Sequence, residues 1–197
     1  RAEVLEKINK AKRVIIVSYP EALFEQIVTK KHFASNLLEF KNGATYSLEF
    51  INELLLEYKF DKVDYVNRPG EFAIRGGIVD VFSYSNDEPY RIEFFGDEVD
   101  SIRSFHPVNQ LSIKTYDRCS VVPDIRELKK KEVKETFLQF VPEQTTIWAK
   151  DFGLISQRLD AEYKRAQEIY ANLESQTIKY SPPNELFYQG QRFNEEI

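Results

Sequence analysis

Apolar and polar residues alternate with a period of two across the middle of the chain, which is the pattern of strands with one buried face. The alternation recurs in five short stretches, near residues 62–66, 70–75, 78–83, 90–95 and 99–105. Turn-forming residues separate these stretches, at Gly70, Gly76-Gly77, Ser85-Asn86-Asp87 and Gly96-Asp97. Short alternating strands joined by such turns predict an antiparallel, strongly bent sheet.

Both flanks follow another pattern, in which helical periodicity alternates with continuous apolar runs. Residues 1–11 and the stretch from Pro20 to Val28 predict helices, and Arg13 to Ser18 predicts a buried strand between them. Ser47 is suited to cap an amphipathic helix, whose apolar positions recur at helical spacing in Ile51, Leu54, Leu55 and Tyr58.

A strand and a long helix are predicted beyond Pro123. Residues 145–149 have the composition of a strand, and Asp151 can cap the helix that follows. We expect one stripe of that helix to be core, namely Leu154, Ile155, Leu159, Tyr163, Ala166, Ile169, Tyr170 and Leu173. The chain thus divides into an α/β layer, made of residues 1–44 and 124–197, and an inserted α+β domain over residues 45–123.

Strand alternation also predicts which side chains of the inserted domain face outward. Tyr90, Ile92 and Phe94 share one side of their strand, and Arg91, Glu93 and Phe95 share the other. The same parity turns Arg75 outward on its own strand. Arginine and aromatic residues are enriched at protein interfaces, so Arg75, Arg91 and Phe95 are candidate binding residues.

A structural alternative remains open for the same residues, because single exposed apolar side chains are common. In it, Phe95 packs under a loop or helix, and both arginines pair with Glu93, Asp97 or Glu98 on a solvated face.

Composition narrows the kind of protein, its location and the class of its binding partner. The chain has 197 residues, 42% hydrophobic and 30% charged, with a single Cys and no apolar run of membrane-spanning length. It lacks a signal-peptide pattern, so we expect a cytoplasmic location. It begins at Arg and contains no Met, so we expect a piece of a longer protein. Between residues 45 and 123 there are 14 acidic and 8 basic residues, which favours a protein partner over DNA.

An enzyme hypothesis finds little support in the residue types. His32, His106 and Cys119 are isolated from one another, at no spacing typical of a metal site or a nucleophile–base pair. An acidic set offers carboxylates for a cation, but the turn within it favours a solvated hairpin end; its members are Glu93, Asp97, Glu98 and Asp100. We expect no catalytic residues, no metal and no cofactor in this chain.

Two sequence runs carry a resemblance to a known family. The first is Gly70-Glu-Phe-Ala-Ile-Arg-Gly-Gly-Ile-Val-Asp-Val-Phe, and the second is Arg91-Ile-Glu-Phe-Phe-Gly-Asp-Glu-Val. Together they resemble the UvrA-binding domain shared by bacterial transcription-repair coupling factors (Mfd) and UvrB. In that family the matching arginines and second phenylalanine contact UvrA. The resemblance thus implies a UvrA-binding role for Arg75, Arg91 and Phe95, with Glu93 as a further candidate.

The resemblance also implies an architecture and a biological setting. In these families the UvrA-binding domain is inserted into a helicase-like α/β domain, which the two flanks resemble by order of elements. A coupling factor is an ATP-dependent DNA translocase that recruits UvrA to stalled RNA polymerase in transcription-coupled nucleotide excision repair. ATP and Mg, RNA polymerase and DNA are then expected at other domains, and a C-terminal domain is expected to cover the UvrA-binding surface.

Two other identities stay open at this point. One is a fragment of UvrB, a damage-verifying ATPase that uses the same surface. UvrB needs a G-x-x-x-x-G-K-[ST] phosphate loop, and no glycine of this chain opens that pattern, although such a loop can lie upstream of Arg1. The other is a generic β-rich adaptor domain without a role in repair.

Overall fold

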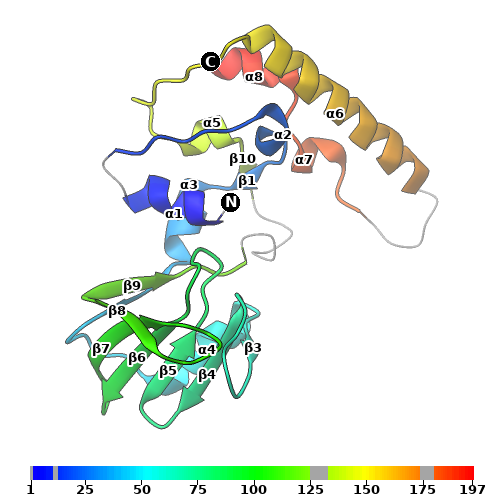
Figure 1. The fold of residues 1–197 in the computed structure, drawn as a ribbon. Coiled ribbons are helices and arrows are strands. Elements are labelled where there is room, and N and C mark those ends of the chain that lie inside the picture. Colours follow the sequence, from blue (N-terminus) through cyan, green and yellow to red (C-terminus); the bar gives the residue numbers. More distant parts are fainter. Residues whose placement is uncertain (1, 11–12, 125–132, 174–179) are drawn as a thin grey trace. The chain divides into compact units, whose positions relative to one another are not determined.

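The computed structural model describes residues 2–10, 13–124, 133–173 and 180–197. It is a mixed α/β structure in which the chain forms two compact units, each built from two separate stretches (Figure 1). Unit 1 comprises residues 1–12 and 31–131, and unit 2 comprises residues 13–30 and 132–197. Unit 1 therefore holds α1 (Ala2–Lys10) together with the region where the alternating strands were predicted.

A six-stranded sheet dominates unit 1, with its strands in sequence order (Figure 1). These strands are β3 (Asp61–Lys62), β4 (Glu71–Arg75), β5 (Ile78–Val81), β6 (Tyr90–Phe95), β7 (Glu98–Phe105) and β8 (Ser112–Tyr116). The first pair is parallel and all the others are antiparallel. The predicted antiparallel sheet is confirmed from β4 to β7, and β8 extends it. The strand predicted near 62–66 is wrong beyond Lys62, and β3 pairs in parallel.

A second ladder and two further helices complete unit 1. Strand β2 (Leu38–Lys41) pairs with β9 (Arg118–Val121) in antiparallel register. Helix α3 (Lys30–Ser35) precedes β2, and α4 (Leu48–Glu57) follows it.

The core of unit 1 lies between α4 and one face of the sheet. Ser47 accepts a hydrogen bond from the Phe50 amide at the start of α4, as the predicted N-cap requires. Ile51 and Leu55 of this helix are fully buried in one cluster with the inward residues of the sheet. Those inward residues include Phe72, Val79, Val81, Tyr90, Ile92, Val99 and Ile102.

Two register shifts interrupt the sheet, one of them in β6 between Glu93 and Phe94. Such bulges bend a strand and increase its twist. The turn between β4 and β5 fits against this bulge, because the Phe94 amide donates to the Gly77 carbonyl at 2.7 Å. A Cβ at Gly77 would lie 2.7 Å from the Phe94 carbonyl oxygen, so the close approach requires glycine.

Unit 2 is mainly helical. Its elements are α2 (Pro20–Leu23), β1 (Ile27–Val28), β10 (Lys134–Glu135), α5 (Phe137–Phe140), α6 (Phe152–Leu173), α7 (Pro183–Leu186) and α8 (Gly190–Glu196). Strands β1 and β10 form a short antiparallel pair. Leu159 of α6 packs with Tyr188 and Phe193 in a small core, and Asp151 caps α6 at the Leu154 amide.

Three predictions for the flanks are wrong. Residues 13–18 and 145–149 are not strands, and Ile15, Val17 and Trp148 within them are at least 90% exposed. The helix from Pro20 ends at Leu23, because the chain then turns into β1.

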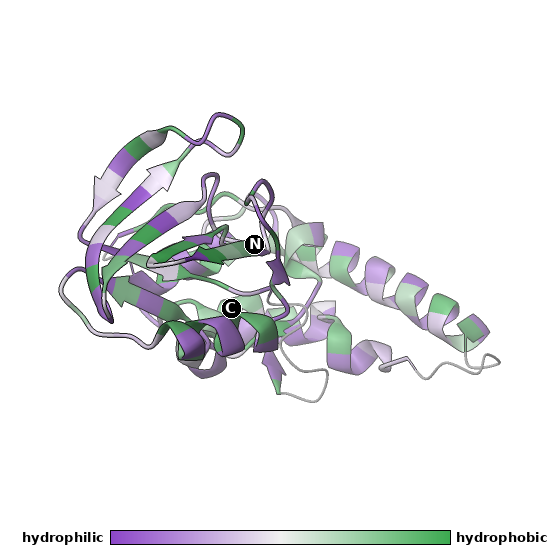
Figure 2. Cartoon of the chain, turned by 90° about the horizontal axis from the view of Figure 1, so that it is seen from below, coloured by the Kyte–Doolittle hydropathy of each residue, from purple (hydrophilic) through white to green (hydrophobic). Residues whose placement is uncertain are grey.

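The predicted apolar stripe of α6 is core at only one residue. Of the stripe, Leu159 is buried, whereas Leu154 and Ile169 are more than half exposed. Hydrophobic and hydrophilic residues alternate along the whole helix in Figure 2. The boundaries of the two compact units differ from the domain division predicted at 44/45 and 123/124. That domain division stays a prediction.

Thiol labelling provides a test of the unit 1 core. Burial raises the pKa of the Cys119 thiol to about 12. At pH 8 such a thiol carries on the order of a thousandfold less thiolate than an exposed cysteine with a pKa near 8.5. We expect a thiol reagent such as DTNB to label Cys119 very slowly in the native chain and rapidly in urea. Rapid native labelling would show that Cys119 is not buried.

The Gly77 contact can be tested by substitution. Gly77→Ala should lower the free energy of unfolding by about 1–3 kcal/mol, because the added methyl group meets backbone that cannot move cheaply. It should also shift the NMR amide signals of Phe94 and Phe95. Gly76→Ala is the control, since a Cβ there meets open space and only the positive φ of 57° is unfavourable. Unchanged Phe94 and Phe95 signals in Gly77→Ala would contradict the contact.

Candidate protein-binding surface

The outward face of the six-stranded sheet carries the predicted binding residues. Arg75, Asp80 and Arg91 lie on the adjacent strands β4, β5 and β6, and Asp80 is directly opposite Arg91 in the register. A small apolar cluster covers the same face beside them, formed by Val66, Ala73, Phe82 and Phe105. The inward residues of these strands belong to the main core, which confirms the predicted side-chain alternation.

Asp80 is fully buried and pairs with both arginines. The Arg91 side chain donates through Nε to Oδ1 at 2.7 Å and through Nη2 to Oδ2 at 2.8 Å. Arg75 donates through Nη2 to Oδ2 at 2.5 Å. The fork of Arg91 matches the carboxylate in the bidentate geometry that makes such pairs strong. One buried carboxylate therefore fixes two guanidinium groups on neighbouring strands.

Arg91 is largely enclosed on this face. Its guanidinium carbon lies 4.5 Å from the centre of the Phe105 ring, and Nη2 also donates to Oε1 of Gln110 at 3.0 Å. Only 15% of the side chain is exposed. The hydrogen bonds to Asp80 raise the pKa of Arg91, in agreement with a permanent charge held by a carboxylate.

Arg75 is more open than Arg91. Its side chain is 41% exposed, and its guanidinium lies 5.3 Å from the centre of the Tyr65 ring. Its second nitrogen donates to the Asp64 carbonyl. Arg75 is thus held on one side and accessible on the other.

Phe95 is the most exposed of the predicted residues. It ends β6 after the bulge, opposite Glu98, and 86% of the residue is accessible to solvent. The alternative that Phe95 packs under a loop or helix is therefore wrong. The alternative pairing of Arg75 and Arg91 with Glu93, Asp97 or Glu98 is also wrong, because both arginines pair with Asp80.

Glu93 lies on the outward face but has its own partners. It accepts hydrogen bonds from Ser101 at 2.8 Å and from Arg103 at 2.5 Å and 3.2 Å. The Ser101 hydroxyl and the Arg103 guanidinium outweigh partial burial and hold the pKa of Glu93 below its usual value. Its carboxylate is therefore ionised and paired before any partner arrives.

Three residues of this face were not predicted from the sequence, namely Asp80, Gln110 and Tyr65. Asp80 interrupts an apolar run, Ile-Val-Asp-Val-Phe, at the parity that faces outward, and this signal was available in the sequence. Gln110 lies in a loop and has no periodicity to locate it. Tyr65 fell inside a predicted strand that in fact ends at Lys62.

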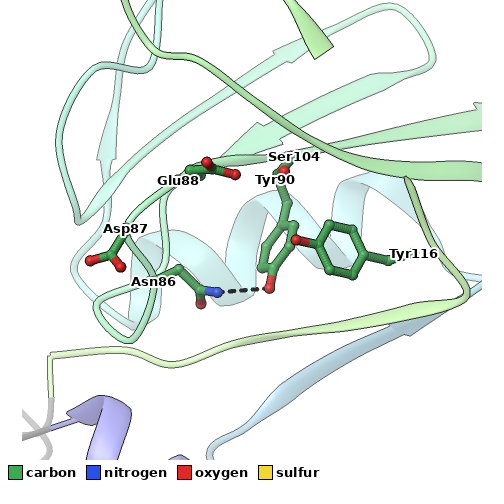
Figure 3. Close-up of a pocket in the computed structure, with 6 residues that line it drawn as sticks. All are labelled: Asn86, Asp87, Glu88, Tyr90, Ser104 and Tyr116. Carbon is green, nitrogen blue, oxygen red and sulfur yellow. Dashed lines mark hydrogen bonds between the residues drawn. The ribbon is translucent and has the colours of Figure 1, made fainter. Parts of the chain in front are cut away.

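A polar cavity of about 210 Å³ lies on the opposite side of the sheet (Figure 3). Its lining includes Asn86, Asp87, Glu88, Tyr90, Ser104 and Tyr116. The Asn86 amide donates to the Tyr90 hydroxyl at 2.7 Å. Neither a thiol nor an imidazole lines this cavity, so it offers no nucleophile–base pair of the usual kind.

The remaining residues considered for chemistry stay apart. Within residues 2–10, 13–124, 133–173 and 180–197, no three His, Cys, Asp or Glu side chains are grouped so that they could hold a metal ion. The histidines are placed on α3 (His32) and after β7 (His106), whereas Cys119 is buried in β9. None of the helices in the described parts of the chain is long and apolar enough to cross a membrane.

The fold and this surface can be compared with known proteins. Residues 38–126 match the family model described as the UvrB interaction domain. The transcription-repair-coupling factor of Bacillus subtilis is 32% identical over 123 residues, which are 62% of this chain and 10% of that protein. The coupling factor of Mycobacterium bovis is 46% identical over 63 residues, or 32% of this chain and 5% of that protein.

Similarity extends to a second group of repair proteins. UvrABC system protein B of Streptococcus suis is 23% identical over 158 residues, which are 80% of this chain and 24% of that protein. The chain thus matches about a tenth of the Bacillus coupling factor and about a quarter of this UvrB. Residues 38–126, rather less than half of the chain, are therefore similar to the UvrB interaction domain family.

Proposed function

We propose that this chain is a protein-binding, non-catalytic region of a transcription-repair coupling factor, and that the surface formed by Arg75, Arg91 and Phe95 binds UvrA. The observation that carries the proposal is the exposure of Phe95 at the end of β6, the strand that also holds Arg91 of the Asp80 ion pair. Fixed arginines and an exposed aromatic side chain on one sheet face are residue types enriched at protein interfaces. The match of residues 38–126 to the UvrB interaction domain supports the same role.

The wider setting is part of the proposal. The parent protein would be a cytoplasmic ATP-dependent DNA translocase that recruits UvrA to stalled RNA polymerase. Its ATP and Mg sites, its contacts with DNA and polymerase, and the C-terminal domain that covers this surface would belong to other regions. The flanks would derive from a helicase-like α/β domain interrupted by the UvrA-binding domain. Similarity to UvrB over 80% of the chain supports this origin of the flanks.

A fragment of UvrB is the second candidate, favoured by the length of that match. The coupling factor comes first because its identity reaches 46% over the 63 residues shared with the Mycobacterium bovis protein. Both candidates assign the same surface to UvrA. A binding experiment therefore tests the shared role first, and a generic adaptor without a repair role predicts no binding.

Titration of this chain with purified UvrA tests the surface. Phe95→Ala and Arg75→Ala should each weaken binding by about tenfold or more, as truncated hot-spot residues do. The free energy of unfolding of Phe95→Ala should change by less than about 0.5 kcal/mol, because its side chain is exposed. Arg75→Ala should lose more stability, because it removes one partner of the buried Asp80 carboxylate. Phe50→Ala is the matched control, since Phe50 is 55% exposed on α4 rather than on the outward face of the sheet. Equal binding by all variants would refute the assignment, and so would no binding by the folded wild-type chain.

Asp80→Asn tests whether the buried carboxylate fixes the arginines. The substitution keeps the shape but removes the charge that Arg75 and Arg91 share, so we expect a loss of about 1–3 kcal/mol in the free energy of unfolding. UvrA binding should weaken as well, because the guanidinium groups lose their common partner. Asp100→Asn, at an exposed position of β7, serves as the control in urea titrations. An Asp80→Asn chain as stable as the control would contradict the role of this ion pair.

A further inference from the structure

The three residues assigned so far are too few to form a stable interface. A specific protein–protein interface typically buries about 800 Å² on each partner and involves about 20–30 residues a side. The neighbours that the arginines hold in place are therefore the first candidates to extend the surface. Two loops qualify, one beside Arg75 and one beside Arg91.

Tyr65 is the exposed aromatic residue of the loop beside Arg75. It is 66% exposed, although the next residue, Val66, is fully buried in the outer apolar cluster. The Arg75 guanidinium lies 5.3 Å from the Tyr65 ring and donates to the neighbouring Asp64 carbonyl. Arg75 therefore connects Tyr65 to the Asp80 ion pair.

The backbone after Tyr65 is also anchored. The carboxylate of Glu71 accepts hydrogen bonds from the Asn67 and Arg68 amides at 2.8 Å and 3.0 Å. These donors outweigh the burial of the carboxyl group and hold the pKa of Glu71 below its usual value. A side chain on such an anchored loop loses little conformational freedom on binding, which favours affinity.

The loop beside Arg91 runs from His106 to Leu111 and exposes two apolar side chains. Val108 is 83% exposed and Leu111 is 66% exposed. Between them, Gln110 adopts a positive φ of 60°, which residues other than glycine rarely adopt. Unfavourable backbone conformations of this kind persist where the surrounding contacts hold them, and they cluster at functional sites.

Gln110 is held by three hydrogen bonds. Its amide donates to the His106 carbonyl at 2.8 Å, and its side-chain nitrogen donates to the Pro107 carbonyl at 2.7 Å. Its side-chain oxygen accepts from Arg91 at 3.0 Å. The loop that exposes Val108 is thus hydrogen-bonded to Arg91 through Gln110. The loop that carries Tyr65 is likewise hydrogen-bonded to Arg75 through the Asp64 carbonyl.

We propose that the UvrA-binding surface extends over both loops, with Tyr65 and Val108 as additional contact residues. This extension rests on the proposed function. A complementary partner surface would place carboxylates against the open side of Arg75 and apolar recesses against Tyr65, Phe95 and Val108. Because both loops contact the arginine pair, we assign them the same partner as Arg75 and Phe95.

Binding to purified UvrA tests the extension with four variants of the 197-residue chain. Tyr65→Ala should weaken binding about tenfold, whereas Tyr65→Phe should keep most of the affinity because the ring is retained. Val108→Glu should weaken binding at least as strongly as Tyr65→Ala, since a charge would enter an apolar contact. Val108→Ala should have a smaller effect of the same sign. Urea titrations should show wild-type stability for all four variants.

Matched controls separate position from composition. Phe50→Ala removes an exposed aromatic ring from α4, and Val17→Glu places a charge at a valine that is 93% exposed in unit 2. Both controls should bind UvrA like the wild type. Because Arg75 holds Tyr65, the Arg75→Ala/Tyr65→Ala double variant should weaken binding by less than the product of the two single fold-changes.

The outcomes distinguish the extension from the function on which it rests. Wild-type affinity in Tyr65→Ala and Val108→Glu, together with weak binding by Phe95→Ala, would overturn the extension and leave the UvrA assignment standing. No binding by the folded wild-type chain would overturn both. Weak binding by the loop variants with normal binding by the controls is the result that supports the extension.

Discussion

A carboxylate without solvent access is the constraint that organises the candidate surface. Burying an unpaired charge costs several kcal/mol, so Asp80 requires cationic partners on the strands beside its own. Arg75 and Arg91 supply them from β4 and β6, on either side of β5. The ion pairs therefore connect three strands on the outward face, and the positions of two guanidinium groups follow from the register of the sheet. A partner would meet charges that are already oriented, which lowers the cost of ordering them on binding.

The same face separates a rigid charged part from an accessible apolar part. Arg91 is 15% exposed and stacks on Phe105, so its main contribution is to structure. Phe95 is 86% exposed and lies beyond the bulge that Gly77 accommodates. Removal of Phe95 thus affects what the surface can contact, whereas removal of Arg91 also leaves Asp80 with one fewer partner. The exposed fraction of each side chain, rather than its residue type, decides which of the two effects dominates.

The alternation of apolar and polar residues was sufficient to predict strands where neighbouring strands supply the hydrogen bonds. It placed β4 to β7, the outward direction of Arg75 and the exposure of Phe95, because each strand pairs with the next one along the chain. It failed at residues 13–18 and 145–149, where the apolar composition of a strand is present but the described residues supply no pairing strand. Composition favours an extended backbone, but only a partner makes that backbone a strand. Asp80 was missed for a related reason, since its role depends on cross-strand neighbours that a single run does not reveal.

The acidic balance of the domain is not repeated at the centre of its outward face. Residues 45–123 carry 14 acidic and 8 basic side chains, yet the centre of the outward face has three arginines, including Arg103, against Asp80 and Glu93. Most of this positive charge is paired at short range, so its field is weak beyond about one Debye length of roughly 8–10 Å. This face therefore attracts a polyanion such as DNA only weakly at long range. The face is better suited to short-range recognition, because it combines fixed hydrogen-bond donors with an exposed aromatic ring. That combination suits the folded surface of a protein partner.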